Sequence, residues 1–362
     1  MRIHARFSIV IALILLSLVS LSALAKEKGV GVWKPTNMVG ADAPQGVAVS
    51  PDGSIWALYG PPDGSAPWSL VRSDNGGTTW TTVLAHSVEI WPYISFNVDL
   101  WVVDSASCAW VYTLSEGLSR FSPSGDLLTT TGLDLSSSFF GSQMVSSLDG
   151  YLYRLTNGLM GDTLERISWN GQVRTTPFPP GEIAREMAVD SKGTLFTVGY
   201  AVRRSRDGGL NWEILLEGRL DFPFFYISIA PDDTIYITSP SFKRSTDGGE
   251  TWETVESGAS WIVGLPDGSI TAIFGVGATI PGGVFRYFLY RSWDRGNTWT
   301  YFLPGIDATD FRAGSVVGAY GDRTVYAYFS FLEGAASPDG LYRLLLPSPS
   351  GRAGADKAWL KY

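Results

Sequence analysis

From about residue 46 onward, apolar and polar residues alternate in short runs that are broken by tight turns. In Val47–Trp56, for example, a Pro-Asp-Gly turn separates two runs rich in β-branched and aromatic residues. A period of two around such a turn predicts an antiparallel β-hairpin. Seven hairpins of this kind are predicted, at Val47–Trp56, Val102–Tyr112, Val145–Tyr153, Met187–Phe196, Ile227–Tyr236, Trp261–Ile270 and Val316–Tyr326.

A second repeat alternates with the hairpins. Four copies of the pattern Ser-x-Asp-x-Gly-x-Thr-Trp, with small departures, begin at Ser73, Ser205, Ser245 and Ser292. Three weaker echoes fill the gaps, at Ser122–Gly125, Ser168–Gly171 and Ser348–Gly351. An arginine precedes each of these positions, at intervals of 38 to 52 residues, namely Arg72, Arg120, Arg166, Arg204, Arg244, Arg291 and Arg343. This period fits one propeller blade, so we predict an all-β fold, a single seven-bladed β-propeller of four-stranded antiparallel blades.

Two segments are candidates for the strand that closes the ring. Gly31–Lys34 would supply the outer strand of the last blade from the N-terminal side, and Ala358–Lys361 would supply it from the C-terminal side. The N-terminal segment is the favoured one.

The four full repeats are predicted to be structural turns between the third and fourth strands of their blades. The acidic or amide side chain accepts N–H bonds from its own turn, and the glycine two residues later supplies a positive φ. The closing tryptophan is expected to be buried against the blade. Since the turn already uses the carboxylate oxygens, acid–base work by them is not expected. The residues concerned are Ser73, Asn75, Gly77, Trp80, Ser205, Asp207, Gly209, Trp212, Ser245, Asp247, Gly249, Trp252, Ser292, Asp294, Gly296 and Trp299.

The N-terminus carries a leader. A basic start is followed by an apolar run from Phe7 to about Leu24, which ends in Ala23-Leu24-Ala25. This pattern predicts a secretory signal peptide over residues 1–25, a mature propeller domain over 26–362, and a secreted or extracytoplasmic location. The alternative is an uncleaved anchor, since the run approaches the length of a membrane span. We expect no transmembrane segment once the leader is removed.

Charge and residue usage narrow the chemistry. The formal net charge is −8 and there is no basic tract, so nucleic acid is not expected as a partner. After the leader the chain has one histidine, His86, which argues against a histidine metal site or a histidine-based triad. Cys108 is the single cysteine, and its apolar surroundings predict a buried filler. No metal and no cofactor are expected.

The four full repeats resemble the Asp-box (BNR) repeat of sialidases, of the sortilin propeller, of xyloglucan-degrading hydrolases and of photosystem II assembly and stability factors. This resemblance implies a propeller of the sialidase-like superfamily. A single seven-bladed ring is shorter than the sortilin ring or the tandem propellers of the xyloglucanases. Sialidases carry a Phe/Tyr-Arg-Ile-Pro motif ahead of their first repeat. This motif is absent here, because no arginine occurs between Arg6 and Arg72, which directly precedes the first repeat.

Ligands of propellers usually bind the face lined by the connections between the second and third strands and between successive blades. One such connection, Thr176–Glu186, carries the aromatic Phe178. The candidate ligand-binding residues of this face are Trp91, Tyr93, Arg185, Glu186, Arg219, Asp221, Asp310 and Arg312.

Two functions from different classes remain open. The favoured one is an exported, monomeric, non-catalytic binding or assembly scaffold that recognises a carbohydrate or a protein surface. The alternative is a sialidase-like glycoside hydrolase. By resemblance, three arginines (here Arg185, Arg219 and Arg312) would grip the substrate carboxylate beside a Tyr–Glu pair and an Asp. A role like that of the photosystem II assembly factors is a narrower form of the first.

Overall fold

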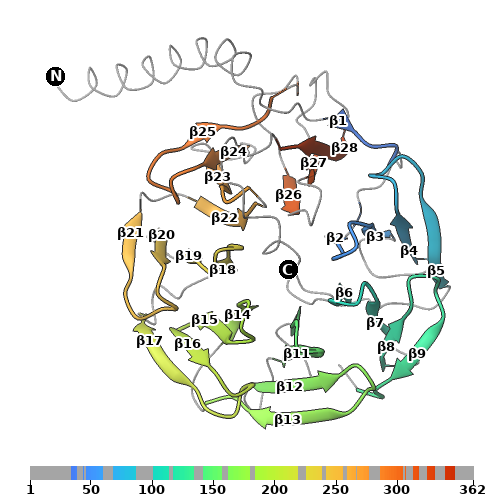
Figure 1. Cartoon of the computed structure of the whole chain (residues 1–362), viewed down its shortest axis with the longest axis horizontal. Helices are drawn as coiled ribbons and strands as arrows, with labels where there is room; N and C mark the ends of the chain where they lie inside the picture. The colour runs from blue at the N-terminus through green and yellow to red at the C-terminus, as the bar shows by residue number, and fades with distance from the viewer. Residues whose placement is uncertain are drawn as a thin grey trace, which may run out of the picture.

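The computed structural model describes residues 34–38, 44, 46–59, 68–86, 101–113, 117–133, 142–156, 162–179, 184–218, 226–238, 242–255, 259–265, 267–276, 286–304, 306, 313–317, 324–330 and 339–346. These residues form strands and turns without a helix, and the strands make seven four-stranded antiparallel sheets. Figure 1 shows the sheets arranged as blades around a central axis. The prediction of a seven-bladed β-propeller is confirmed.

Each of the first six blades consists of four consecutive strands, which we call a, b, c and d from the axis outward. Blades 1 to 3 contain β2 (Gly46–Val49), β3 (Ile55–Tyr59), β4 (Trp68–Ser73) and β5 (Thr81–His86); β6 (Trp101–Val103), β7 (Ala109–Thr113), β8 (Gly117–Phe121) and β9 (Leu127–Thr130); and β10 (Ser142–Ser146), β11 (Tyr151–Thr156), β12 (Thr163–Ser168) and β13 (Val173–Pro177).

Blades 4 to 6 contain β14 (Ala184–Val189), β15 (Leu195–Gly199), β16 (Ala201–Ser205) and β17 (Glu213–Glu217); β18 (Tyr226–Ile229), β19 (Ile235–Thr238), β20 (Phe242–Ser245) and β21 (Glu253–Val255); and β22 (Ala259–Gly264), β23 (Ile270–Val276), β24 (Arg286–Ser292) and β25 (Thr300–Tyr301). Blade 7 is built from β26 (Ala313–Val317), β27 (Thr324–Ser330), β28 (Gly340–Leu345) and β1 (Lys34–Pro35).

The predicted hairpins are the a–b pairs of the blades, and an aspartate shapes several of their turns. Ser54 donates its backbone N–H to Asp52 Oδ1 at 3.0 Å, and Ser269 donates to Asp267 Oδ1 at 3.1 Å. This is the local hydrogen bond that favours aspartate in turns. The alternation of strand direction then places the a–b and c–d turns at one end of the ring, which we call the box face. The b–c connections and the links between blades lie at the other end, the loop face.

The N-terminal segment closes the ring. β1 pairs with β28, with Lys34 opposite Arg343 and Pro35 opposite Tyr342, so closure from the N-terminal side is confirmed. Of the predicted segment Gly31–Lys34, only Lys34 belongs to the described residues. Blue β1 lies beside red β28 in Figure 1. Strand d of blade 7 therefore comes from the opposite end of the chain, and the predicted echo at Ser348–Gly351 lies outside the described residues.

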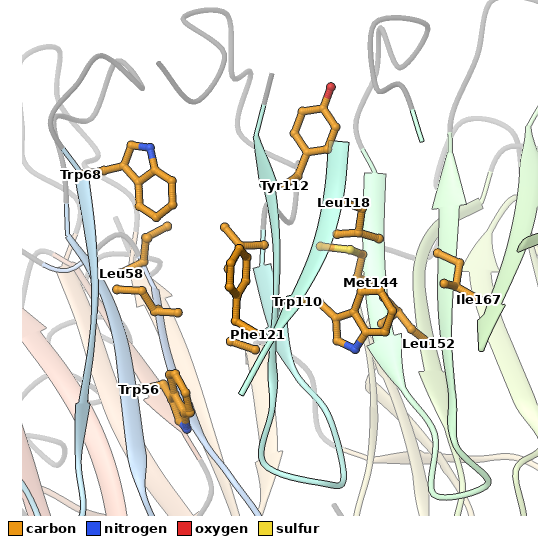
Figure 2. Packing of buried hydrophobic residues seen from close by; sticks show 13 residues of the cluster. Trp56, Leu58, Trp68, Trp110, Tyr112, Leu118, Phe121, Met144, Leu152 and Ile167 are labelled. Atoms are coloured by element: carbon orange, nitrogen blue, oxygen red, sulfur yellow. The ribbon is translucent and has the colours of Figure 1, made fainter. Parts of the chain in front are cut away.

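The apolar core lies between blades. One cluster joins Trp56 of blade 1, Trp110 of blade 2 and Leu152 of blade 3, each with no exposed surface. Figure 2 shows the side chains of this cluster on successive blades, with Leu118 and Met144 close to Trp110. Because each blade covers its apolar faces with its neighbours, the fold is stabilised by repetition around the ring.

No helix in the described part of the chain is long and apolar enough to cross a membrane. The predicted signal peptide lies outside the described residues, so the leader and the location remain predictions.

Candidate functional site

Two of the eight residues predicted to line the loop face belong to the described structure. Arg185 and Glu186 lie at the start of β14, the innermost strand of blade 4, instead of in a connecting loop. The pairing of β14 with β15 shifts between Ala184 and Glu186, which makes Arg185 an extra, exposed residue of a β-bulge. Bulges redirect side chains and are frequent beside binding sites. The other six candidates, Trp91, Tyr93, Arg219, Asp221, Asp310 and Arg312, lie outside the described residues.

Glu186 links two inner strands. Its Oε2 accepts a hydrogen bond from the backbone N–H of Ile227 in β18 at 2.7 Å. Gln143 of blade 3 occupies the corresponding position of β10, and its Oε1 accepts the N–H of Met187 in β14 at 2.9 Å. Side chains near the axis therefore join the inner strands of blades 3, 4 and 5, and this network holds the half-buried Glu186 carboxylate in place.

Tyr226, the first residue of β18, lies close to Glu186 of β14. Burial raises the pKa of the Tyr226 phenol, and the nearby Glu186 carboxylate and Tyr287 raise it further. The side chain is nevertheless 39% exposed. A protonated phenol beside a fixed carboxylate provides hydrogen bonds and an aromatic surface.

Phe178, an aromatic residue of the link between blades 3 and 4, is part of the apolar core. It is buried between blades 3 and 4, where its ring meets that of Trp212 edge-on at a centroid distance of 5.1 Å. The link between blades therefore begins inside the apolar layer, where an aromatic ring is more stable than in solvent.

On the box face, the four turns Ser73–Trp80, Ser205–Trp212, Ser245–Trp252 and Ser292–Trp299, here called the box turns, share one hydrogen-bond pattern. In the turn of blade 4, Ser205 Oγ accepts the N–H of Gly209 at 2.8 Å and donates to Asp207 Oδ1 at 2.8 Å. Asp207 Oδ1 also accepts the N–H of Asn211 at 2.9 Å. In blade 1, Asn75 Oδ1 takes the place of the carboxylate and accepts the N–H of Thr79 at 2.8 Å.

These hydrogen bonds keep the box carboxylates ionised. The backbone and side chain of Asn211 lower the pKa of Asp207 to about 2, and the hydroxyl and backbone N–H of Thr251 do the same for Asp247. At Asp294 desolvation acts in the opposite direction, but hydrogen bonds from Thr298 prevail and the pKa is lowered. A carboxylate of this kind is a poor proton donor near neutral pH.

The box tryptophans pack against the preceding blade. Trp212 of blade 4 joins a cluster with Leu164 of blade 3, Trp252 of blade 5 joins one with Val202 of blade 4, and Trp299 of blade 6 packs at 6.2 Å from Phe242 of blade 5. Their side chains are half-buried, which is less than the burial expected from the sequence, because strand d lies at the rim of the ring.

The glycine at the fifth position of each box turn (Gly77, Gly209, Gly249 and Gly296) also packs closely against the preceding blade. A Cβ at Gly77 would lie 2.7 Å from Thr36, and one at Gly209 would overlap the side chain of Leu164. Both glycines have a positive φ, of 80° and 87°. Glycine is therefore required here for space as well as for backbone conformation.

An arginine from the preceding blade clasps every box turn, a contact that sequence reasoning missed. Each arginine donates to the carbonyl oxygen of the residue at the fourth position of the turn, and we call this contact the arginine clasp. The four clasps are Arg343 Nη1 to Gly76 at 3.1 Å, Arg174 Nη2 to Gly208 at 2.7 Å, Arg204 Nη1 to Gly248, and Arg244 Nη1 to Arg295 at 2.8 Å. Arg343, Arg204 and Arg244 belong to the series of arginines that precede the repeats. The sequence therefore showed the donor residues of these contacts, but not the carbonyl oxygens that accept from them.

Metal and thiol chemistry find little support in the described part of the chain. Within it, no three His, Cys, Asp or Glu side chains are grouped to hold a metal ion. Cys108 is buried as predicted, and burial raises the pKa of its thiol. A thiol with a raised pKa is a weak nucleophile.

No protein-family model matches the sequence, and no curated protein matches it. Solved structures do match. YCF48 from Cyanidioschyzon merolae has a TM-score of 0.53 and 13% identity, with 88% of this chain and 100% of that chain covered. An oligogalacturonate lyase in complex with manganese has a TM-score of 0.55 and 12% identity, covering 83% and 88%.

A third match is an ancestral GH74 enzyme, with a TM-score of 0.51 and 16% identity. The alignment covers 86% of this chain, which spans about half the length of that enzyme (47%). At such low identity, these likenesses show a shared propeller fold and leave activity open.

Proposed function

We propose that this chain is an exported binding or assembly propeller that recognises a carbohydrate or a protein surface through its loop face, without catalysis. The observation that carries the proposal is the arrangement of Arg185, Glu186 and Tyr226 on the inner strands of blades 4 and 5. A guanidinium, a fixed carboxylate and a protonated phenol lie there on rigid strands, two of them exposed. Such a mixture of charge and aromatic surface suits recognition of hydroxyl-rich or peptide surfaces. The predicted leader supports export, and the ring is proposed to act as a monomer.

A sialidase-like glycoside hydrolase is the second candidate, and one observation favours it. Tyr226 lies beside Glu186, as a tyrosine nucleophile lies beside its carboxylate base. The absence of the Phe/Tyr-Arg-Ile-Pro motif argues against the hydrolase. A role resembling that of photosystem II assembly factors is supported by the repeat and the leader alone.

A glycan array and co-purification from the native envelope or secretome, both with the mature chain, test the binding role. We expect a bound glycan or protein whose capture is strongly reduced by Arg185→Ala and Tyr226→Ala. Leu128→Ala is the matched control, because Leu128 is 49% exposed on β9, the outer strand of blade 2. Equal capture by all three variants would exclude the proposed face.

Hydrolysis of a fluorogenic sialoside separates the two candidates. The binding proposal expects no turnover by the mature chain. Turnover that is lost in both Tyr226→Phe and Arg219→Ala would replace it with the hydrolase.

A further inference from the structure

The box turn of blade 6, Ser292–Trp299, departs from the other three at two positions. After the serine it has the indole of Trp293, where the other box turns have polar residues, Asp74, Arg206 and Thr246. Two residues later it has Arg295, where the others have glycine, Gly76, Gly208 and Gly248. The shared hydrogen-bond pattern is intact in this turn, since Ser292 Oγ accepts the N–H of Gly296 at 2.7 Å. The turn therefore needs neither side chain for its own geometry.

Trp293 presents a fixed aromatic surface to solvent. Its side chain is 55% exposed, and the guanidinium carbon of Arg291 lies 4.6 Å from the centroid of its ring. The same guanidinium lies 4.7 Å from the ring of Phe302, so Arg291 is held between two aromatic rings. Arg291 is itself buried, donates to Ser269 Oγ at 2.8 Å and forms an ion pair with Asp267. One part of the indole is thus packed on an immobilised cation, and the rest is open.

Arg295 occupies a backbone conformation that disfavours any residue except glycine. Its φ is +59°, in the left-handed region. The side chain is half exposed, and its Nη2 lies 2.9 Å from Asp232 Oδ2 of blade 5. The other three box turns have glycine at this position with a similar φ of 68°, 70° and 74°, so the turn sets the conformation and arginine replaces glycine in spite of the strain. The exposed indole and the strained arginine are independent departures, and they occur two residues apart.

We propose that this box turn forms a carbohydrate subsite on the box face, in which Trp293 stacks on a neutral pyranose ring and Arg295 and Asp232 bind its hydroxyl groups. A pyranose ring has apolar C–H faces and a rim of hydroxyls. It therefore fits an aromatic platform beside one hydrogen-bond donor and one acceptor. In the described residues around the turn, Arg295 is paired with Asp232 and Arg291 with Asp267, while the exposed Asp294 carboxylate is hydrogen-bonded to Thr298 and stays ionised. This surplus of negative charge favours a neutral sugar over an acidic one.

The subsite lies on the face opposite Glu186 and Tyr226, so it does not depend on the function proposed for the loop face. The chain can therefore fail the test of the loop face and still pass the test of this subsite, or the reverse.

Isothermal titration of the full mature chain with cellohexaose, a flat neutral oligosaccharide, tests the proposal, with hexagalacturonate as the acidic comparison. We expect cellohexaose to bind more tightly than hexagalacturonate. Trp293→Thr, which installs the residue found at this position in the turn of blade 5, should weaken binding at least about tenfold. Leu210→Thr is the matched control, since Leu210 is 53% exposed on the box turn of blade 4, and it should leave affinity unchanged.

Arg295→Gly separates binding from stability. Glycine adopts the observed φ without strain, so the melting temperature should stay constant or rise while affinity for cellohexaose falls. A purely structural Arg295 predicts the opposite, a lower melting temperature with unchanged affinity. The proposal is overturned if cellohexaose does not bind, if hexagalacturonate binds more tightly, or if Trp293→Thr leaves affinity intact. Binding of a proline-rich peptide at Trp293 without any sugar would also overturn it.

Discussion

Blades 1, 4, 5 and 6, which have box turns, and blades 2 and 3, which have shorter c–d turns, contact their neighbours in different ways. The turns of blades 1, 4, 5 and 6 each offer a backbone carbonyl to an arginine of the preceding blade. The short turn of blade 3 carries Trp169 instead, whose ring lies 4.6 Å from the guanidinium carbon of Arg120 in blade 2. Glycine packing is common to both types, since a Cβ at Gly171 of blade 3 would lie 2.7 Å from Thr129 Oγ1 of blade 2. The close glycine contact is thus the shared requirement of the repeat, and the arginine clasp is an addition.

The interface between blades 2 and 3 also contains a buried ion pair. Arg154 on β11 and Glu165 on β12 are paired through two hydrogen bonds, and both side chains are buried. They share the blade face of Leu152 and Ile167, which packs on Trp110. Since desolvation of two charges offsets most of their attraction, apolar contacts remain the main source of stability here.

The largest expected effect tests the shared requirement. Gly209→Ala and Gly171→Ala should each lower the free energy of unfolding by about 2–5 kcal/mol, because a left-handed φ and a steric overlap act together. Gly53→Ala is the control, since Gly53 has a φ of +83° but no atom within 4 Å of an added Cβ. It should cost only about 1–2 kcal/mol. Urea unfolding measures all three, and equal losses would show that steric contact with the preceding blade plays no part.

A smaller effect is expected from removing one clasp. Arg204 is buried and donates to Gly248 O, to Glu213 at 2.6 Å and to Glu250 at 2.7 Å. Arg204→Met should therefore cost about 1–3 kcal/mol of unfolding free energy. Arg206→Met is the matched control: Arg206 contacts the same two glutamates but is 61% exposed. Its loss should stay within about 1 kcal/mol. If the two variants lose the same stability, the clasp adds nothing beyond surface charge.

The smallest expected effect is a loss of folding stability at low pH. The pKa values of Asp207 and Asp247 are depressed to about 2 in the folded chain. Their contribution to stability is therefore full above the unfolded pKa, near 4, and is lost as the pH falls through 2. Asp247→Asn should leave stability at pH 7 nearly unchanged, since Asn75 shows that an amide satisfies the same turn. It should also flatten the decrease of the urea midpoint between pH 4 and pH 2. An unchanged slope would show that this carboxylate is not linked to folding.

The candidate sites were predictable only in part. Arg185 and Glu186 stood out as charged residues before an inner strand, whereas Tyr226 was passed over, because nothing local marks it as the neighbour of Glu186. The burial of Phe178 is visible only in the structure, since an aromatic residue in a connecting segment has the same local pattern whether it faces solvent or the next blade. Trp293 occupies the unspecified second position of the repeat pattern, and its exposure is visible only in three dimensions.

The sequence by itself determined the all-β class, the number of blades and the positions of the turns. These depend on alternation, glycine and aspartate within a few residues, and such interactions are local. Only the tertiary structure decided which blade each arginine clasps and which strand closes the ring. Arg343 and Gly76 meet across 267 residues of chain, and local patterns cannot specify a partner at that separation. Packing of one complete blade on the next specifies these partners. The apolar faces of all blades are removed from water only when consecutive blades lie side by side around the axis.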